Sequence, residues 1–197
     1  MSNMSARVIS GKAKGRRLKL VPGDSTRPIM DRVKESLFNI LGDVGGTHWL
    51  DLFAGTGQVG IEALSRGASS VLFVEIDRLA VRTIQENLEV TKLGERAVIR
   101  RADVFHLLRQ PPAQPFDYIY VAPPQYRSLW LQTLQALDKN PAWIPPGTVV
   151  IVQIDPSEEL PVTLAHLEAY DQRRYGKTLL WFFVARAAHG SDEAQES

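Results

Sequence analysis

Short apolar runs alternate with amphipathic stretches along most of the chain. The apolar runs have the length of strands and cover residues 48–53, 70–75, 97–101, 116–121 and 147–154. Between them, apolar residues recur at helical spacing over residues 58–66, 79–91, 104–109 and 128–137. Strands that alternate with helices in this way form a parallel sheet with helices on both faces. The pattern therefore predicts an α/β fold.

The last two predicted strands, residues 167–175 and 177–187, do not follow this rule. Only Gly176 separates them, which is too short for a crossover connection, so they must be antiparallel neighbours. We therefore expect a mostly parallel sheet of seven strands that finishes in an antiparallel hairpin.

The N-terminal part of the chain divides into two patterns. Residues 28–41 carry apolar side chains at helical spacing, and Gly42 is a suitable end for that helix. The segment before it mixes short apolar stretches with Gly, Lys and Arg, which favours a small hairpin or an extended arm. We expect a basic arm over residues 1–27, one α/β domain over residues 28–187, and a polar, disordered tail over residues 188–197.

Composition narrows the kinds of site that the chain can carry. It contains no cysteine, which excludes disulfides, thiol nucleophiles and cysteine-based metal sites. The four histidines show no metal-ligand spacing, so we expect no metal. No apolar run approaches the roughly eighteen residues of a membrane span, and the first residues lack the apolar core of a signal peptide. The expectation is a cytoplasmic protein with no membrane contact.

The net charge of +1 conceals an asymmetry along the chain. Residues 1–34 hold nine basic and two acidic residues, whereas the rest holds fourteen basic and twenty acidic ones. A basic arm is typical of proteins that bind polyphosphates, because each Lys or Arg near a phosphate releases condensed counterions. The alternative is a solvated tail without that role. The leading candidates for contacts with the phosphates of a nucleic acid are Arg16, Arg17, Arg27, Arg32 and Lys34.

The most informative motif is WLDLFAGTGQVG, residues 49–60. A buried strand leads to Asp51, and Gly55 and Gly57 allow a tight turn before a helix, at the sheet edge where ligands of open α/β folds bind. The motif also matches the dinucleotide fingerprint GxGxxG, but such glycines equally serve tight packing of helix against sheet. An acid at this strand end would repel a pyrophosphate, whereas it suits the ammonium group of a sulfonium cofactor.

Acidic residues also follow the next two predicted strands. Glu75 can accept hydrogen bonds from both hydroxyls of a ribose, and Asp103 would lie where an adenine amino group needs an acceptor. Each acid alone is consistent with a surface carboxylate at the start of a loop, but three in order are typical of a site. The residues expected to bind S-adenosylmethionine are Asp51, Phe53, Gly55, Gly57, Glu75, Ile76, Asp103 and Val104.

A second loop, Ala122-Pro123-Pro124-Gln125-Tyr126, follows the fourth predicted strand. The prolines fix φ and turn backbone carbonyls toward the crevice, and the aromatic can stack on a flipped-out base. Alone, the loop is equally consistent with a rigid turn and a core aromatic. Together with the glycine turn it indicates methyl transfer to an amino group, and its five residues are the candidate catalytic residues.

Four stretches stand in a fixed order: STRPIMDRVKESLFNIL (residues 25–41), DLFAGTGQVGIEALSRGA (51–68), VEIDR (74–78) and the double-proline loop. In this order they resemble the bacterial 16S ribosomal RNA guanine-N2 methyltransferase family, and the resemblance covers nearly the whole chain. It implies a Rossmann-like class I methyltransferase sheet and S-adenosylmethionine as the methyl donor. It also implies a guanine of 16S rRNA, in the assembling small ribosomal subunit, as the substrate.

The chain departs from the family pattern in one place. The family's loop carries Asp, Pro, Pro and an aromatic, whereas here Ala122 replaces the acid and Gln125 precedes Tyr126. Backbone carbonyls and the Gln125 amide oxygen are then left to orient the amine. Two other functions therefore stay open: a catalytically silent RNA-binding member of the family, favoured by Ala122, and a dinucleotide-dependent oxidoreductase, which rests on GxGxxG alone.

Overall fold

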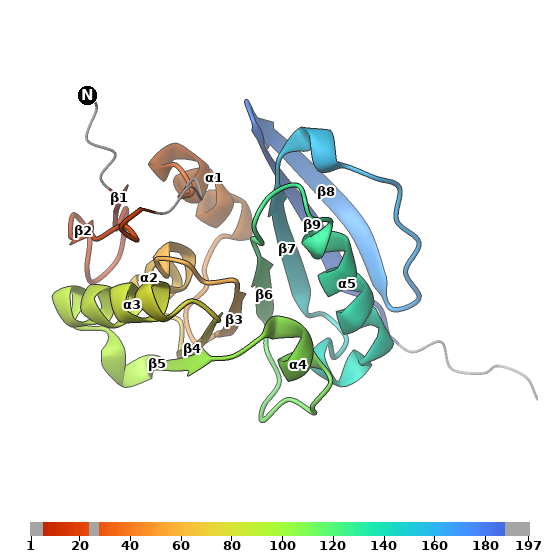
Figure 1. Ribbon diagram of the computed structural model, residues 1–197, viewed down its shortest axis with the longest axis horizontal. Helices are drawn as coiled ribbons and strands as arrows, with labels where there is room; N and C mark the ends of the chain where they lie inside the picture. Colours follow the sequence, from red (N-terminus) through yellow and green to blue (C-terminus); the bar gives the residue numbers. More distant parts are fainter. Residues whose placement is uncertain (1–5, 24–27, 188–197) are drawn as a thin grey trace, which may run out of the picture.

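The computed structural model describes residues 6–23 and 28–187, and it contains one large sheet with helices on both faces (Figure 1). The seven strands lie in the order β5-β4-β3-β6-β7-β9-β8. The first five are parallel to one another, and β9 is antiparallel to both β7 and β8. The strands are β3 (His48–Leu52), β4 (Ser70–Glu75), β5 (Ala97–Arg101), β6 (Tyr118–Val121), β7 (Val149–Ile154), β8 (Leu167–Tyr175) and β9 (Thr178–Ala185).

The helices alternate with these strands as predicted. They are α1 (Asp31–Leu41), α2 (Gln58–Ser65), α3 (Arg78–Thr91), α4 (Val104–Leu108) and α5 (Leu129–Lys139), with short 3-10 turns η1 (Gly94–Arg96), η2 (Pro141–Trp143) and η3 (Pro156–Glu158). The predicted bounds of β4, β5 and β8 are those observed, and the other predicted elements differ by three residues at most. The mostly parallel sheet with an antiparallel C-terminal pair is confirmed.

Alternation along the strands divides the core into two layers. Trp49 of β3 belongs to the layer with α1, α2 and α3, where its ring stacks between those of Phe38 and Tyr118. The next residue, Leu50, belongs to the layer with α4 and α5, which contains Trp130. Both faces of the central strands are therefore apolar, which explains their uninterrupted apolar runs.

The last strand in the sequence, β9, lies inside the sheet and not at its edge. Its five central residues, from Leu179 to Phe183, are all buried, whereas most residues of β8 are exposed. A strand that is apolar on both faces needs a covered position, and a polar strand tolerates the edge. The sequence predicted the hairpin but not this insertion of β9 between β7 and β8.

The arm is a small antiparallel hairpin of β1 (Ala6–Arg7) and β2 (Arg17–Leu18). Val8, Ala13 and Leu18 are buried and belong to the layer of α1, α2 and α3. The described part of the arm is thus packed into the core. The expected tail over residues 188–197 and the junction at residues 24–27 lie outside the described residues.

Neither a membrane span nor a metal centre is found in the described ranges. No helix there is long and apolar enough to cross a bilayer. No group of three or more His, Asp or Glu side chains is arranged in them to hold a metal ion.

Candidate cofactor and substrate site

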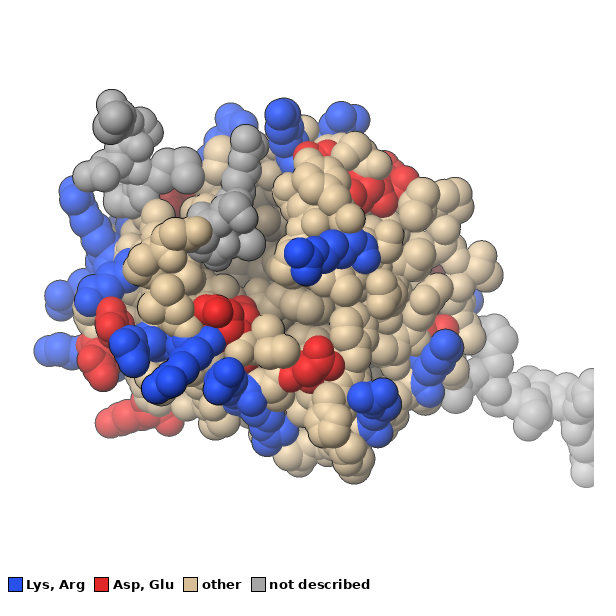
Figure 2. All heavy atoms as spheres, viewed as in Figure 1, with Lys and Arg blue, Asp and Glu red and all other residues tan. Residues whose placement is uncertain are grey.

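The carboxyl ends of β3, β4, β5 and β6 meet at one edge of the sheet (Figure 1). Leu52 pairs with Val74 on one side and Val121 on the other, and Glu75 pairs with Arg101. The structure thus brings together the cofactor loop (residues 53–57), the end of β4, the start of α4 and the reaction loop (residues 122–126). Figure 2 shows a hollow near the centre of this face, with acidic side chains on its lower rim.

The cofactor loop turns through left-handed backbone conformations. Gly55 and Gly57 have φ values of 57° and 77°, and Gly57 is the N-cap residue of α2. Phe53 has a φ of 58° without being a glycine, a conformation that costs about 1–3 kcal/mol and concentrates at binding sites. Its ring packs edge-on against Phe105 of α4, with 6.4 Å between the ring centroids.

The third glycine of the GxGxxG match has a packing role. A Cβ added to Gly60 would lie 2.3 Å from Cε1 of Phe73, so the helix α2 lies directly on β4. Close approach of helix and sheet accounts for this glycine without any pyrophosphate. A dinucleotide-binding fingerprint uses its third glycine for the same packing, so Gly60 does not distinguish between the two cofactor classes.

Asp51 lies at the end of β3, beneath the first turn of α2. Its side chain is buried, and Oδ2 accepts a hydrogen bond from the Gly60 N–H at 3.2 Å. Oδ1 is also buried and finds no hydrogen-bond donor among the described residues. Burial raises the pKa of Asp51 well above its usual value, and the nearby Glu75 carboxylate raises it further. An oxygen in this state is stabilised when a cation or another donor reaches it.

Glu75 fastens the end of β4 to the cofactor loop. Oε2 accepts from the Gly55 N–H at 2.8 Å, and Oε1 accepts from the N–H groups of Ile76 and Asp77 at 2.8 and 2.9 Å. Three of the roughly four acceptor positions of a carboxylate are therefore occupied. Glu75 can bind both ribose hydroxyls only if one of these backbone donors is released.

The end of β5 provides the third acid, and the residue after β4 provides an apolar surface. Asp103 caps α4, with Oδ1 accepting from the His106 N–H at 2.8 Å, and its side chain is exposed. Ile76 is 60% exposed although it is apolar, whereas Val104 is buried. Ile76 lies between Glu75 and Asp77 in the sequence, and its exposed side chain is suited to the face of a purine ring.

The reaction loop presents its aromatic side chain to solvent. Tyr126 is 70% exposed and has a φ of 63°. Its N–H donates to Oε1 of Glu158 at 2.8 Å, and its hydroxyl lies 3.4 Å from Oδ2 of Asp155. Two acids near η3 thus hold a strained loop residue with its ring outward. Hydrogen bonds from Ser157 keep the pKa of Asp155 below its usual value.

Glu158 and Asp155 were missed by the sequence analysis. Both follow β7, so they lie at the same edge of the sheet as the other strand-end acids. The strand-end rule that selected Asp51, Glu75 and Asp103 would have selected them as well, had it been applied to the fifth parallel strand. Oε2 of Glu158 is buried and has no hydrogen-bond partner among the described residues.

Basic side chains border the hollow in several places and are most numerous on one side of it (Figure 2). Arg16, Arg17 and Arg32 are exposed, and Figure 2 shows Lys and Arg gathered on the left part of this face, where β1, β2 and α3 lie in Figure 1. Arg27 lies outside the described residues. The prediction that these arginines contact RNA phosphates stays a prediction.

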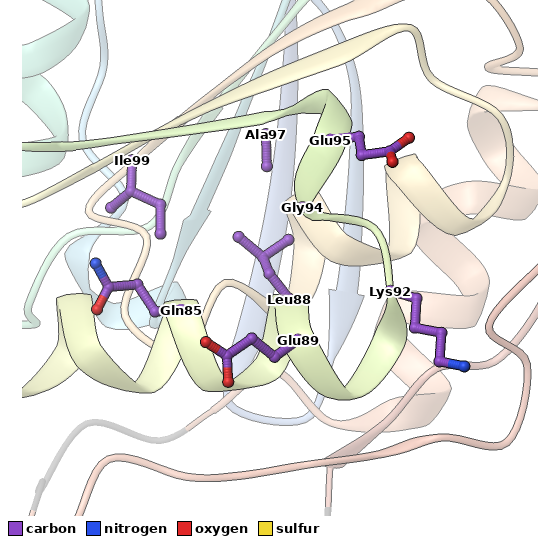
Figure 3. Close-up of a pocket in the computed structure, with 8 residues that line it drawn as sticks. All are labelled: Gln85, Leu88, Glu89, Lys92, Gly94, Glu95, Ala97 and Ile99. Atoms are coloured by element: carbon purple, nitrogen blue, oxygen red, sulfur yellow. The ribbon is translucent and has the colours of Figure 1, made fainter.

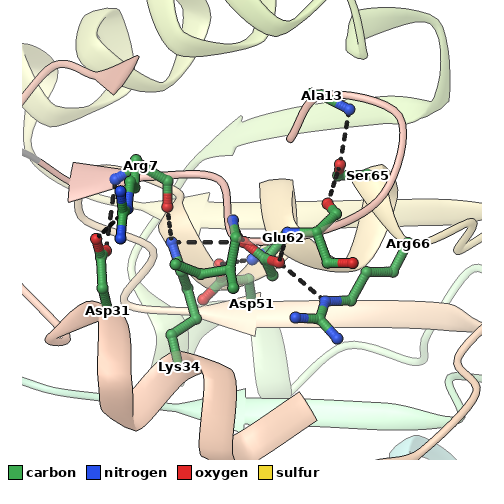
Figure 4. Close-up of polar contacts among 11 residues, drawn as sticks. Arg7, Ala13, Asp31, Lys34, Asp51, Glu62, Ser65 and Arg66 are labelled. Atoms are coloured by element: carbon green, nitrogen blue, oxygen red, sulfur yellow. Dashed lines mark hydrogen bonds and ion pairs between the residues drawn. The ribbon is translucent and has the colours of Figure 1, made fainter. Parts of the chain in front are cut away.

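Lys34 requires a correction, because its side chain is completely buried. Its Nζ donates to the Arg7 carbonyl at 2.6 Å and lies 3.5 Å from Oε2 of Glu62 (Figure 4). Burial lowers the pKa of Lys34 despite the nearby carboxylate. The sequence placed this lysine among the phosphate contacts from its charge alone, but it fastens the arm to α1 and α2.

A separate groove lies elsewhere on the described part of the molecule (Figure 3). It has a volume of about 580 Å³ and lies between α3, η1 and β5, where Leu88, Ala97 and Ile99 form its apolar part. None of the predicted site residues lines it. The candidate site is therefore the strand-end hollow and not this groove.

The strand-end residues fit a cofactor with a cationic amino group, a ribose and a purine. Asp51 offers an uncompensated buried oxygen, Glu75 a carboxylate, and Ile76 an exposed apolar surface. Five parallel strands are followed in this sheet by β9, which is inserted antiparallel between β7 and β8. This strand order and the glycine turn after β3 define the class I methyltransferase fold.

The chain belongs to the family described as "Conserved hypothetical protein 95", whose model matches residues 6–184. It is 39% identical to "Putative rRNA methyltransferase YlbH" of Bacillus subtilis (strain 168), over 87% of this chain and 95% of that protein. It is 35% identical to "Ribosomal RNA small subunit methyltransferase D" of Haemophilus influenzae, over 78% of this chain and 81% of the relative. The chain also superimposes on a solved structure, "Putative methyltransferase yhhF from Escherichia coli", with a TM-score of 0.82 and 30% sequence identity. The superposition covers 92% of this chain and 98% of the other chain.

Proposed function

We propose that this protein transfers a methyl group from S-adenosylmethionine to the exocyclic N2 amine of a guanine in small-subunit ribosomal RNA. The observation that carries the proposal is the juxtaposition, at one sheet edge, of the acid-lined cofactor loop and the strained loop that displays Tyr126. The names of the two relatives support RNA, and for one of them small-subunit RNA, as the substrate class.

The methyl donor is S-adenosylmethionine, whose sulfonium supplies an activated methyl group. In the proposal, Asp51 Oδ1 compensates the ammonium group of the amino-acid portion. Glu75 accepts from one ribose hydroxyl at the acceptor position that its three backbone donors leave free. Asp103 has a second carboxylate oxygen available for the adenine amino group, because only Oδ1 is engaged in the cap of α4. Ile76 covers one face of the adenine.

The reaction loop orients the target amine. The lone pair of a guanine N2 amine is delocalised into the ring, so catalysis depends on placing that nitrogen in line with the methyl group. The carbonyls of Ala122 and Pro123 accept from the amine, while Pro124 keeps the loop rigid and Tyr126 stacks against the base. Gln125 is exposed and offers a further amide oxygen in the place where the family's acid is absent.

The decisive experiment combines the purified protein with labelled S-adenosylmethionine and small ribosomal subunits from cells that lack this gene. Mass spectrometry of the digested RNA should then show N2-methylguanosine formed in proportion to added enzyme. A Tyr126→Ala variant should reduce this product by roughly 5- to 150-fold, because stacking of a base on an aromatic ring contributes about 1–3 kcal/mol.

One residue favours a second candidate, an RNA-binding protein without activity. Ala122 leaves the reaction loop without the acid of the family pattern. If the wild-type protein binds S-adenosylmethionine and small subunits but transfers no methyl group, while Ala122→Asp does transfer it, the second candidate is correct. Formation of a different methylated nucleoside would instead contradict the guanine-N2 assignment.

A further inference from the structure

Asn87 of α3 is a completely buried amide that links two distant segments. Its Oδ1 accepts from the Lys19 N–H at 2.7 Å, and its Nδ2 donates to the Lys19 carbonyl at 3.0 Å. The same Nδ2 donates to the Thr56 carbonyl, also at 3.0 Å. One side chain therefore binds the backbone of the arm and the backbone of the cofactor loop.

The arm is held firmly at its other contacts as well (Figure 4). The Glu62 carboxylate on α2 accepts from the N–H groups of Ile9 and Ser10 at 2.9 and 3.0 Å. Gly11 lies so close to α2 that a Cβ there would be 1.9 Å from the Ser65 carbonyl oxygen. Residues 9–11 are therefore anchored on α2, and a displacement of the hairpin beyond them reaches Lys19 and its buried partner Asn87.

Thr56 is the residue in the cofactor loop that such a change would reach. It lies between Gly55 and Gly57, whose left-handed conformations form the turn of the cofactor loop. The Asn87 amide is planar, and its two hydrogens lie at fixed directions from one nitrogen. It therefore holds the carbonyls of Lys19 and Thr56 at a fixed spacing, and moving either one leaves a buried polar group unsatisfied.

We propose that Asn87 is a positioning residue that couples RNA binding on the arm to cofactor binding in the loop. This inference rests on the proposed function, because it takes RNA phosphates as the ligand of the arm. RNA that fixes the arm near Arg16 and Arg17 also fixes Lys19, and through Asn87 it fixes Thr56 in the cofactor-binding geometry. By linkage, a bound cofactor must strengthen RNA binding by the same factor.

The test compares the wild-type protein with Asn87→Asp, which keeps Oδ1 as an acceptor and loses both donated hydrogen bonds. The dissociation constant of labelled S-adenosylhomocysteine, a non-reactive probe, is measured by equilibrium dialysis with and without saturating small ribosomal subunits. In the wild type, the subunits should tighten binding at least fivefold, the lower end of typical allosteric couplings. In Asn87→Asp this ratio should fall to about one.

Glu86→Gln is the matched control. It removes the exposed ion pair of Lys19 Nζ with Glu86 Oε2, at 2.8 Å, and leaves the Asn87 contacts in place. It should therefore retain the wild-type ratio. A loss of stability alone would weaken the probe more without subunits than with them, because bound subunits stabilise the folded state, and the ratio would then rise. A fall of the ratio to about one therefore separates a loss of coupling from a structural defect.

The outcome can overturn the inference in two ways. A folded Asn87→Asp protein with the wild-type ratio contradicts the coupling. If that variant does not fold, hydrogen exchange of the amides of residues 55–57 in the wild type decides, since the subunits should slow exchange there and unchanged exchange overturns the inference. Failure of the wild type to bind the probe at all would instead contradict the proposed function.

Discussion

Burial makes the ionised form of Asp51 unfavourable in the free protein. Its carboxyl group is buried with one oxygen lacking a donor among the described residues, and this burial raises its pKa. The unfolded chain ionises the same group at the ordinary pKa of an aspartate. Unfolding therefore releases a proton in the pH window between the two pKa values, so the stability of the free protein decreases as the pH rises through that window.

The Asp51→Asn variant should consequently be more stable than the wild type without cofactor, and its advantage should grow with pH across that window. The same variant should bind S-adenosylhomocysteine more weakly, because an amide does not compensate an ammonium group. Thermal unfolding at a series of pH values and calorimetric titration measure the two effects. A variant that is less stable at every pH would contradict this prediction, because it would show that the buried carboxyl group costs less than a buried amide in its place.

Glu158 acts on the backbone of Tyr126. Glu158→Ala should lower kcat/KM for small subunits by about tenfold or more, since a hydrogen bond to a charged group contributes about 1.5–3 kcal/mol. Affinity for S-adenosylhomocysteine should not change. Glu158→Gln keeps an oxygen acceptor and should recover most of the rate, and Glu159→Ala, next in sequence and bonded to Gln172, is the control. Equal losses in both alanine variants would exclude a specific role for Glu158.

Residue identities were predictable where a simple rule applied. The acids at strand ends followed from topology, because parallel strands place their carboxyl ends together. The hydrogen bonds of Glu75 to three backbone N–H groups, and the left-handed φ of Phe53, depend on the exact course of the turn and leave no sequence signal. Charge counting also failed for Lys34, because a count does not distinguish a buried ion pair from an exposed side chain.

At the scale of elements, hydrophobic periodicity was enough to predict most of the helices and strands. The apolar runs of β4 and β5 are bounded by polar residues, and their ends were predicted correctly. The order of the strands in the sheet was harder to predict, since periodicity gives the length and burial of a strand but not its neighbours. The buried pattern of β9 and the exposed pattern of β8 do contain the necessary information, because only β9 is apolar enough for an interior position.

At the scale of the whole molecule, the arm has an exposed basic face and a buried anchoring side. The double variant Arg16→Ala/Arg17→Ala should weaken binding to small subunits and lower the slope of log K against log salt by roughly 0.7–0.9 per residue removed. Its melting temperature should equal that of the wild type, because both side chains are exposed. An unchanged salt slope would mean that these arginines do not contact phosphates.

The Lys34→Ala variant tests the buried anchoring side of the arm, and we expect it to lower the stability of the protein. It leaves the Glu62 carboxylate buried without this partner, a change that typically costs about 3–5 kcal/mol in stability. Arg66, at 2.9 Å from Glu62, reduces that cost. A melting temperature equal to that of the wild type would show that the buried pair contributes nothing to the arm's attachment.

The interior position of β9 has a consequence for the order in which the strands can join the sheet during synthesis. During synthesis, β7 emerges before β9, and its apolar edge has no partner until residues up to Ala185 have left the ribosome. The parallel half of the sheet can assemble earlier, but β8 joins the sheet only through β9. The nascent chain therefore carries an unpaired strand edge that favours association with other chains, and slow translation of the final segment should increase its dependence on chaperones.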